Sequence, residues 1–214
     1  MQFHPNVAQT TILLRAMHEH FLAGDISGEA GKEREQVAAL LEAASKAALP
    51  CYPSGHEVGR YLPSALSLLE RSAHPLAEAL SPIADGLPWR YSYRRRPDLP
   101  GLESAMAWAE IVGPPESLFH SDHVCFGLTL IGPHTHYPAH THPAVELYQV
   151  VAGTAQWQLN GQWSTKPPGS FILHPSHAEH AMRTGEEPLL AIYSWSGAIH
   201  TLSSFSDEDR KEAS

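Results

Sequence analysis

The sequence of 214 residues lacks the features of several large classes of protein. It has only two cysteines, Cys51 and Cys125, which lie far apart and outside any CxxC pair, and this fits a reducing compartment. It has no apolar run of about 18 residues and no charged-then-apolar pattern at the N-terminus, so we expect neither a membrane helix nor a secretion signal. These absences favour a cytoplasmic protein without a membrane partner.

Positive charge is also scarce, because 14 lysines and arginines face 23 aspartates and glutamates, for a formal net charge of -9. A broad nucleic-acid surface is therefore not expected. Four arginines form one basic cluster: Arg90, Arg94, Arg95 and Arg96. We interpret this cluster as a solvated loop or as local salt bridges, and the alternative is a patch that attracts an anionic ligand.

Residues 1–104 have the pattern of a helical region that ends in a connecting loop. Apolar residues at helical spacing predict helices over 7–22, 31–49 and about 57–80. Prolines, aromatic residues and the arginine cluster indicate a loop over 86–104. No motif with evident chemistry falls in this region, so we interpret it as a helical cap or as the dimerisation surface of a homodimer.

Residues 105–200 have the pattern of many short strands, and the sequence Asn160-Gly161 is a strong hairpin signal. The predicted strands are 105–112, 123–131, 155–159, 162–165, 170–174, 179–183 and 189–195. Short strands at this spacing predict a sandwich or barrel. We expect residues 201–214 to form a polar, frayed C-terminal tail. The expected fold class is therefore mainly β with a helical N-terminal region (α+β).

The stretch 137–148 concentrates polar side chains at even positions: His140, His142, Glu146 and Tyr148. A β-strand sends alternate residues to opposite faces, so these four side chains are predicted to point the same way. Two imidazoles and a carboxylate on one face are a metal-ligand set, and a dry interior would otherwise have to neutralise them.

The same parity directs the hydroxyl of Tyr148 into a pocket beside the predicted metal. Free tyrosine has a pKa of about 10, and a nearby dication favours the phenolate. A tyrosinate beside a Lewis acid can remove a carbon-bound proton. The alternative is a tyrosine of the barrel wall that bonds a backbone group.

At this point the sequence resembles the cupin superfamily. The first cupin motif ends in HxH, three or four residues, Glu, six residues and Gly, and the chain has His140, His142, Glu146 and Gly153 at these spacings. Seven residues separate Gly132 from His140, where the family usually has five.

Gly169, Pro175 and His180 match the second cupin motif, and two other positions depart from it. His177 stands where the family has a glycine, and Thr184 stands where it has an asparagine. These departures put the local turn in question, but they leave the ligand position His180 intact. The resemblance covers roughly residues 105–200.

The resemblance implies a single-domain cupin β-barrel (a double-stranded β-helix, or jelly roll) over 105–200. It also implies one bound divalent transition metal, Zn, Fe, Mn, Ni or Co, among which the ligand types do not choose. The implied metal ligands are His140, His142, Glu146 and His180. Four further histidines are interpreted as loop residues or as residues around the ligands: His134, His136, His174 and His177.

The combination of Tyr137, the HxH…Glu pattern, Tyr148, Tyr193 and Trp195 looks like the cupin-type dimethylsulfoniopropionate (DMSP) lyases. By that resemblance Tyr148 would be the base, or a metal ligand that becomes the base when substrate displaces it. Tyr137 would be a second pocket tyrosine and an alternative base, and Trp195 would belong to the substrate wall.

The implied reaction is a β-elimination from a small-molecule substrate. Metal binding by the DMSP carboxylate acidifies the adjacent C–H, a tyrosinate removes that proton, and dimethyl sulfide leaves to give acrylate. Aromatic faces hold a sulfonium by cation–π attraction. The candidates for this contact are Tyr137, Trp195, Tyr193 and Trp108, the last two of which we also interpret as core residues.

Two other functions share the predicted ligands. One is another cupin enzyme, such as an iron dioxygenase, which consumes oxygen and needs no tyrosine base. The other is a non-catalytic cupin that binds a small molecule and releases it unchanged.

Overall fold

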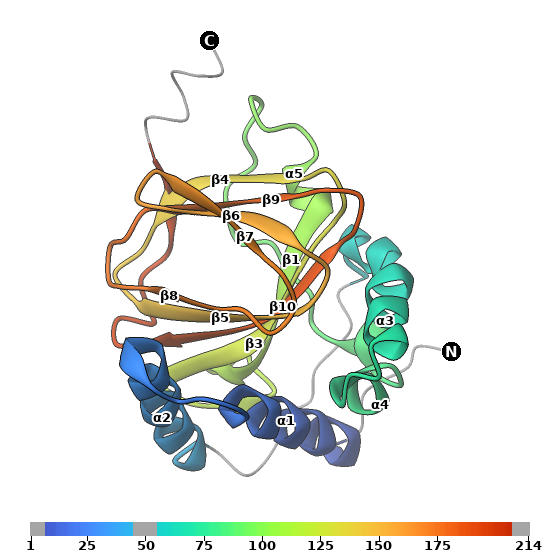
Figure 1. Ribbon diagram of the computed structural model, residues 1–214, viewed down its shortest axis with the longest axis vertical. Coiled ribbons are helices and arrows are strands. Elements are labelled where there is room, and N and C mark those ends of the chain that lie inside the picture. The colour runs from blue at the N-terminus through green and yellow to red at the C-terminus, as the bar shows by residue number, and fades with distance from the viewer. Residues whose placement is uncertain (1–6, 45–54, 207–214) are drawn as a thin grey trace.

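The computed structural model describes residues 7–44 and 55–206 and consists of helices packed on the outside of a β-sandwich (Figure 1). The helical elements are α1 (Val7–Leu22), α2 (Gly28–Glu42), η1 (Glu57–Tyr61), α3 (Leu62–Arg71), α4 (Leu76–Leu80), η2 (Ala84–Gly86) and α5 (Leu102–Ala105). Within the described residues, no helix has the length and apolar character needed to cross a bilayer.

The sandwich has two sheets. The strands are β1 (Met106–Gly113), β2 (Phe119–His120), β3 (Val124–Ile131), β4 (His136–Thr141), β5 (Val145–Ala152), β6 (Ala155–Leu159), β7 (Gln162–Lys166), β8 (Phe171–His174), β9 (His180–Thr184), β10 (Leu189–Ser196) and β11 (Ser204–Phe205). Six strands form one sheet in the order β2-β1-β3-β10-β5-β8, and five form the other in the order β11-β4-β9-β6-β7. Neighbouring strands are antiparallel except β1 and β2. The predicted fold class, helices followed by a cupin-like β-sandwich, is confirmed.

The six-stranded sheet separates two buried clusters, and residue parity decides which cluster a side chain joins. Leu147 and Ile192 pack with the helices on the outer face, where α2 contacts β3, β5 and β8. Tyr148 and Tyr193 belong to the cluster between the sheets. The hydrophobic helical face therefore covers one side of the sheet and leaves the other side to form the site.

The prediction of one continuous helix over 57–80 is wrong. The structure breaks it into η1, α3 and α4, because Ala73 takes a left-handed backbone with φ of 50° and Pro75 follows it. The second predicted helix, 31–49, begins earlier, and α2 ends at Glu42. Its last predicted turn and Cys51 lie outside the described residues.

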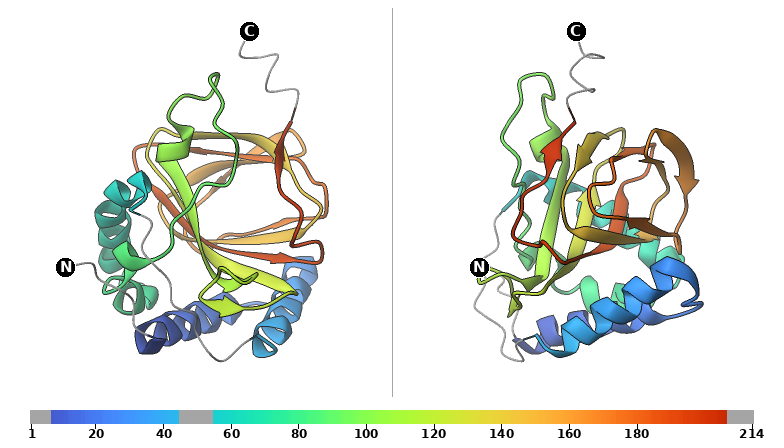
Figure 2. Two further views of the ribbon diagram at one scale, coloured as in Figure 1. Left: turned by 180° about the vertical axis from the view of Figure 1, so that it is seen from behind. Right: turned by 90° about the vertical axis from the view of Figure 1, so that its left-hand side faces the viewer.

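The prediction of a frayed tail is wrong for its first residues. Ser204 and Phe205 form β11, which pairs with Thr141 and His140 of β4. The loop before α5 and this C-terminal strand lie side by side at one end of the sandwich (Figure 2), where the rings of Tyr93 and Phe205 stack with centroids 4.5 Å apart. Residues 207–214 lie outside the described part.

Two residues of the cupin motifs, Gly153 and His177, lie in turns with a left-handed backbone. Gly153 has a φ of 75°, and a Cβ there would lie 2.0 Å from the Pro188 carbonyl oxygen, so only glycine fits. His177 keeps the left-handed turn of the second motif with a φ of 62°, and its N–H donates to the His142 carbonyl over 2.9 Å. The departure at His177 therefore leaves the turn in place.

A pair of histidines lies where α1 meets the chain before α4, and we expect it to make stability depend on pH. The Nε2 atoms of His20 and His74 lie 3.0 Å apart in a hydrogen bond, in which one ring must accept. Burial, and then the charge of His74, lowers the pKa of His20 to about 4, and burial lowers the pKa of His74. The unfolded chain, with histidine pKa values of about 6.5, therefore binds more protons than the folded chain over this window.

We expect the free energy of unfolding to decrease as pH falls from about 6.5 to about 4. Urea unfolding at about pH 7 and about pH 5 should show a smaller loss for His20→Gln than for the wild type. An equal loss in both proteins would show that this pair does not control the dependence.

Candidate metal centre

The inner face of the six-stranded sheet brings the predicted site residues into neighbouring rows. Glu146 on β5 lies opposite His174 on β8 and Trp195 on β10. Two residues further along β5, Tyr148 lies opposite Tyr193. Directly opposite residues have Cβ atoms about 5 Å apart, and Glu146 and Tyr148 share this face as parity predicted. The expectation that His140 and His142 share it too is wrong, because β4 ends at Thr141 in the other sheet and β5 begins at Val145.

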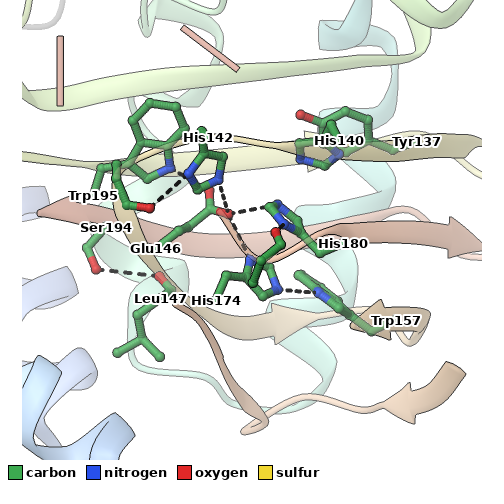
Figure 3. A network of polar contacts seen from close by, with 12 residues as sticks. Tyr137, His140, His142, Glu146, Leu147, Trp157, His174, His180, Ser194 and Trp195 are labelled. Atoms are coloured by element: carbon green, nitrogen blue, oxygen red, sulfur yellow. Dashed lines mark hydrogen bonds and ion pairs between the residues drawn. The ribbon is translucent and has the colours of Figure 1, made fainter. Parts of the chain in front are cut away.

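The other sheet supplies the histidines. His140 and His180 are paired across β4 and β9, with ring centroids 4.0 Å apart, and His142 follows β4. Figure 3 shows His142, His180 and Glu146 pointing toward one another, with His140 beside them. The site therefore lies between the two sheets.

Three of the four predicted ligands converge closely. His142, Glu146 and His180 are buried, and each offers a ligand atom within 4.8 Å of the others. Oε2 of Glu146 lies 3.1 Å from Nε2 of His142 and 3.1 Å from Nε2 of His180. His140 is outside this close group, and its ring stacks on Tyr137 with centroids 4.0 Å apart. Its role as a fourth ligand stays a prediction.

The tautomer of each histidine suits metal binding. In His140, His142 and His180, Nδ1 lies at hydrogen-bond distance from a backbone carbonyl, so Nδ1–H donates and the lone pair of Nε2 is free. The acceptors are Pro138 (2.8 Å), Ala144 (3.0 Å) and Ala178 (2.9 Å). Nε2 of His180 is buried without a hydrogen-bond partner. A carboxylate oxygen that faces Nε2 atoms needs either a proton or a metal ion between them, and imidazoles with one carboxylate fit a divalent transition ion.

Three further residues hold the carboxylate in place. The indole N–H of Trp195 donates to Oε1 of Glu146 over 2.6 Å, and Nδ1–H of His174 donates to Oε2 over 2.9 Å. Trp157 donates to Nε2 of His174 over 2.9 Å, which fixes the His174 tautomer. His174 was interpreted as a loop residue or a residue around the ligands; it ends β8, is fully buried, and contacts a predicted ligand directly.

We expect Trp195→Phe to weaken metal affinity by about 10–100-fold, because the aromatic ring remains while the hydrogen bond that orients Glu146 is lost. Competition with a chromophoric chelator measures this change. The matched control is Trp163→Phe on the exposed strand β7. Equal affinities in the two variants would remove the indole N–H from the support of the metal.

A cavity of about 450 Å³ opens beside these ligands. Its aromatic lining consists of Tyr93, Trp108, Tyr137, Tyr148, Tyr193 and Trp195. Both predicted base candidates, Tyr148 and Tyr137, are 4% exposed and line this cavity. Trp108 and Tyr193, interpreted as core residues as well as substrate contacts, pack in the inner cluster and also line the cavity.

Both tyrosines resist ionisation when no cation is near. Burial, and then the charges of Glu146 and Tyr93, raise the pKa of Tyr148 well above its ordinary value. Burial, and then Tyr93 and Tyr148, do the same for Tyr137. A phenolate in this cavity therefore needs a nearby positive charge.

Sequence reasoning missed two features of the cavity. The hydroxyl of Tyr93, in the predicted loop, lies 2.5 Å from that of Tyr137, and the aromatic pattern Tyr91-x-Tyr93 is the only local signal for it. The second is Glu110, a buried carboxylate on β1.

The arginine cluster forms mainly local salt bridges, as interpreted from the sequence. Arg95 pairs with Glu103, and Arg96 pairs with Asp98. Arg90 pairs with Glu110 and lines the cavity. The alternative, a patch that attracts anions, loses its support at these three paired positions.

The fold and site define a cupin-like protein with a buried histidine–glutamate centre inside an aromatic cavity. Comparison with known proteins points to one family. The model of the dimethylsulfoniopropionate lyase family matches residues 31–191. A protein of Cereibacter sphaeroides, named as a provisional dimethylsulfoniopropionate lyase, DddL, is 34% identical over 172 residues, which are 79% of this chain and 71% of that protein.

Solved structures agree with these matches. A structure from work on the DMSP lyases RdDddP and RnDddQII has 27% identity and a TM-score of 0.72, covering 94% of this chain and 98% of that one. DMSP lyase DddQ from Ruegeria pomeroyi has the same fold, with 22% identity, a TM-score of 0.70, and coverage of 93% and 96%. The chain belongs to the dimethylsulfoniopropionate lyase family, a family of carbon–sulfur lyases.

Proposed function

We propose that this protein is a metal-dependent lyase that cleaves DMSP to dimethyl sulfide and acrylate. The observation that carries the proposal is one cavity that Tyr148 lines together with Glu146, the carboxylate of the His142, Glu146 and His180 group. Family membership supports the substrate and the bond that is cleaved.

Four residues would hold the metal: His140, His142, Glu146 and His180. When bound, a divalent ion supplies a Lewis acid that polarises the substrate carboxylate and favours ionisation of a neighbouring phenol. Nε2 of His180, which lies 3.1 Å from Glu146 Oε2 without hydrogen-bond geometry, and the carbonyl-bonded Nδ1 atoms support this assignment. The identity of the metal is left open by the donor set.

The chain itself would position the substrate and move the proton. The aromatic walls formed by Trp108, Tyr193 and Trp195 hold the sulfonium, each ring adding roughly 0.5–2 kcal/mol of cation–π attraction. The phenolate oxygen of Tyr148 takes the proton from the carbon next to the carboxylate. That electron pair forms the carbon–carbon double bond as the carbon–sulfur bond breaks, so dimethyl sulfide leaves and acrylate remains.

Tyr137 is the alternative base. Its hydroxyl is held by Tyr93 and its ring by His140, so it is fixed at the cavity wall. A hydroxyl engaged by another tyrosine suits orientation of the substrate, whereas Tyr148 lies on the same strand face as Glu146. We therefore assign proton removal to Tyr148.

The test is product analysis with purified, metal-loaded protein and DMSP. We expect dimethyl sulfide in the headspace and acrylate in solution in equal amounts, at the same rate with and without oxygen. Oxygen consumption coupled to substrate loss would instead identify a dioxygenase. Recovery of unchanged DMSP at every metal loading would leave a binding protein and end the proposal.

A further inference from the structure

We infer that Glu110, acting through Tyr193, makes the end of the cavity remote from the metal specific for an onium group. The cavity would thus select three-carbon zwitterions with a carboxylate at one end and a sulfonium or quaternary ammonium at the other. This inference rests on the proposed function for the orientation of the substrate, and it adds a specificity-determining carboxylate outside the metal centre.

Glu110 lies in the same row of the sheet as the proposed base. Tyr148 on β5 is opposite Tyr193 on β10, Tyr193 is opposite Gly127 on β3, and Gly127 is opposite Glu110 on β1. Neighbouring strands are about 4.8 Å apart, so this row extends across four strands from the proposed base to Glu110. Glu110 therefore lies at the far end of the cavity from the proposed base.

Two glycines make room for this arrangement. A Cβ at Gly127 would lie 2.9 Å from Cε1 of Tyr193, so the absent side chain lets the Tyr193 ring lie across β3 toward Glu110. A Cβ at Gly113 would lie 2.6 Å from Oε1 of Glu110 and 2.7 Å from Oγ of Ser117. The backbone thus leaves space for the Tyr193 ring at Gly127 and for the carboxylate at Gly113.

The carboxylate is anchored on one side and joined to the cavity wall on the other. Oε1 accepts from Arg90 over 2.7 Å and from Ser117 over 2.7 Å. Oε2 accepts from the Tyr193 hydroxyl over 3.2 Å. Because Tyr193 donates its proton to a carboxylate, its oxygen and ring carry more negative charge toward the cavity.

Formal charges give the cavity a direction. The remote end holds one positive group, Arg90, and two negative groups, Glu110 and Glu116, the second of which lies 3.6 Å from Arg90 at the surface. The other end holds the imidazoles and the predicted dication. A zwitterion bound with its carboxylate toward the metal therefore places its onium group against aromatic rings and net negative charge.

Two ligands test this inference in the metal-loaded protein: one has only the carboxylate of the substrate, and the other has both the carboxylate and an onium group. Propionate has only the carboxylate, whereas 3-(trimethylammonio)propionate also has an onium group. We expect Glu110→Gln to weaken calorimetric binding of the second ligand about tenfold and that of propionate less than about twofold. With DMSP, KM should rise more than kcat falls.

The matched control is Glu103→Gln. Glu103 lies on α5, just before β1, and its carboxylate pairs with Arg95. This variant should bind both ligands as the wild type does. A second variant, Tyr193→Phe, keeps the ring and loses the hydroxyl, and it should shift the ligand preference in the same direction as Glu110→Gln. It also serves as the test if Glu110→Gln does not fold.

Equal weakening of both ligands in Glu110→Gln and Tyr193→Phe, or no weakening in either, would overturn the inference and leave Glu110 as an anchor for Arg90. The binding measurement does not require turnover. Selective loss of the onium ligand in a protein that releases no dimethyl sulfide would therefore keep this inference and reject the proposed function.

Discussion

Replacing Tyr148 with phenylalanine is expected to lower kcat for DMSP by about 10²–10⁴-fold while metal content stays at the wild-type value, because only the proton-accepting oxygen is lost. The ring stays in place, since it packs edge to face on Trp157 with centroids 5.0 Å apart and opposite Tyr193. Headspace dimethyl sulfide and elemental analysis of the same preparation measure both quantities.

Tyr137→Phe is the matched control, since it removes the hydroxyl of the other cavity tyrosine. We expect a smaller loss of kcat in this variant. The reverse order of losses would transfer proton removal to Tyr137. Loss of metal in Tyr148→Phe would show that the phenol is itself a ligand before substrate binds.

Replacing Glu146 with alanine is expected to give the second large effect, a protein with little bound metal and at least about 10³-fold lower turnover. The variant removes the oxygen that lies 3.1 Å from both His142 and His180. It also leaves the N–H groups of Trp195 and His174 without their acceptor, so we expect a lower melting temperature too.

Elemental analysis gives metal per chain, and a thermal melt reports folding. Glu186→Ala serves as the control because Glu186 is an exposed carboxylate paired with a histidine, His134, at the surface. Full metal content in Glu146→Ala would place the ion elsewhere. Metal loss in the control would show that the substitution acts through overall charge.

The strand face of the site could be predicted from the sequence because alternation along a strand is local. His140, Glu146 and Tyr148 needed no knowledge of distant residues, and the structure places all three around the cavity. Only Glu146 and Tyr148 share a strand, however, because His140 lies on β4 of the other sheet. His142 and His180 complete the close group from that sheet. Leu147, the odd position between Glu146 and Tyr148, faces away and packs with the helices, as alternation requires.

Contacts made over long sequence separations could not be predicted. Tyr93 contacts Tyr137, and Phe205 stacks on Tyr93. Tyr93 lies in a loop and Phe205 in the tail, and neither segment has a periodic pattern that would predict these contacts. Arg34 is a further example, since this charged helix residue is only 1% exposed. Its guanidinium donates to three backbone carbonyls that follow or end α1: Phe21, Ala23 and Asp25.

The departure of His140 from the close group also has a physical reason. The ring stacks on Tyr137 and its Nδ1–H is bonded to the Pro138 carbonyl. Motif spacing places a residue on a strand, but it does not fix the side-chain rotation that neighbouring rings impose. A bulge between Tyr137 and His140 adds to this, because the pairing register with β9 shifts there.

The most direct test of the central claim is dimethyl sulfide release by one protein preparation as its metal is removed and restored. We predict that turnover falls with metal content on chelation, reaches background in the metal-free protein, and returns when one divalent ion per chain is added back. Undiminished turnover by a metal-free protein would contradict the account.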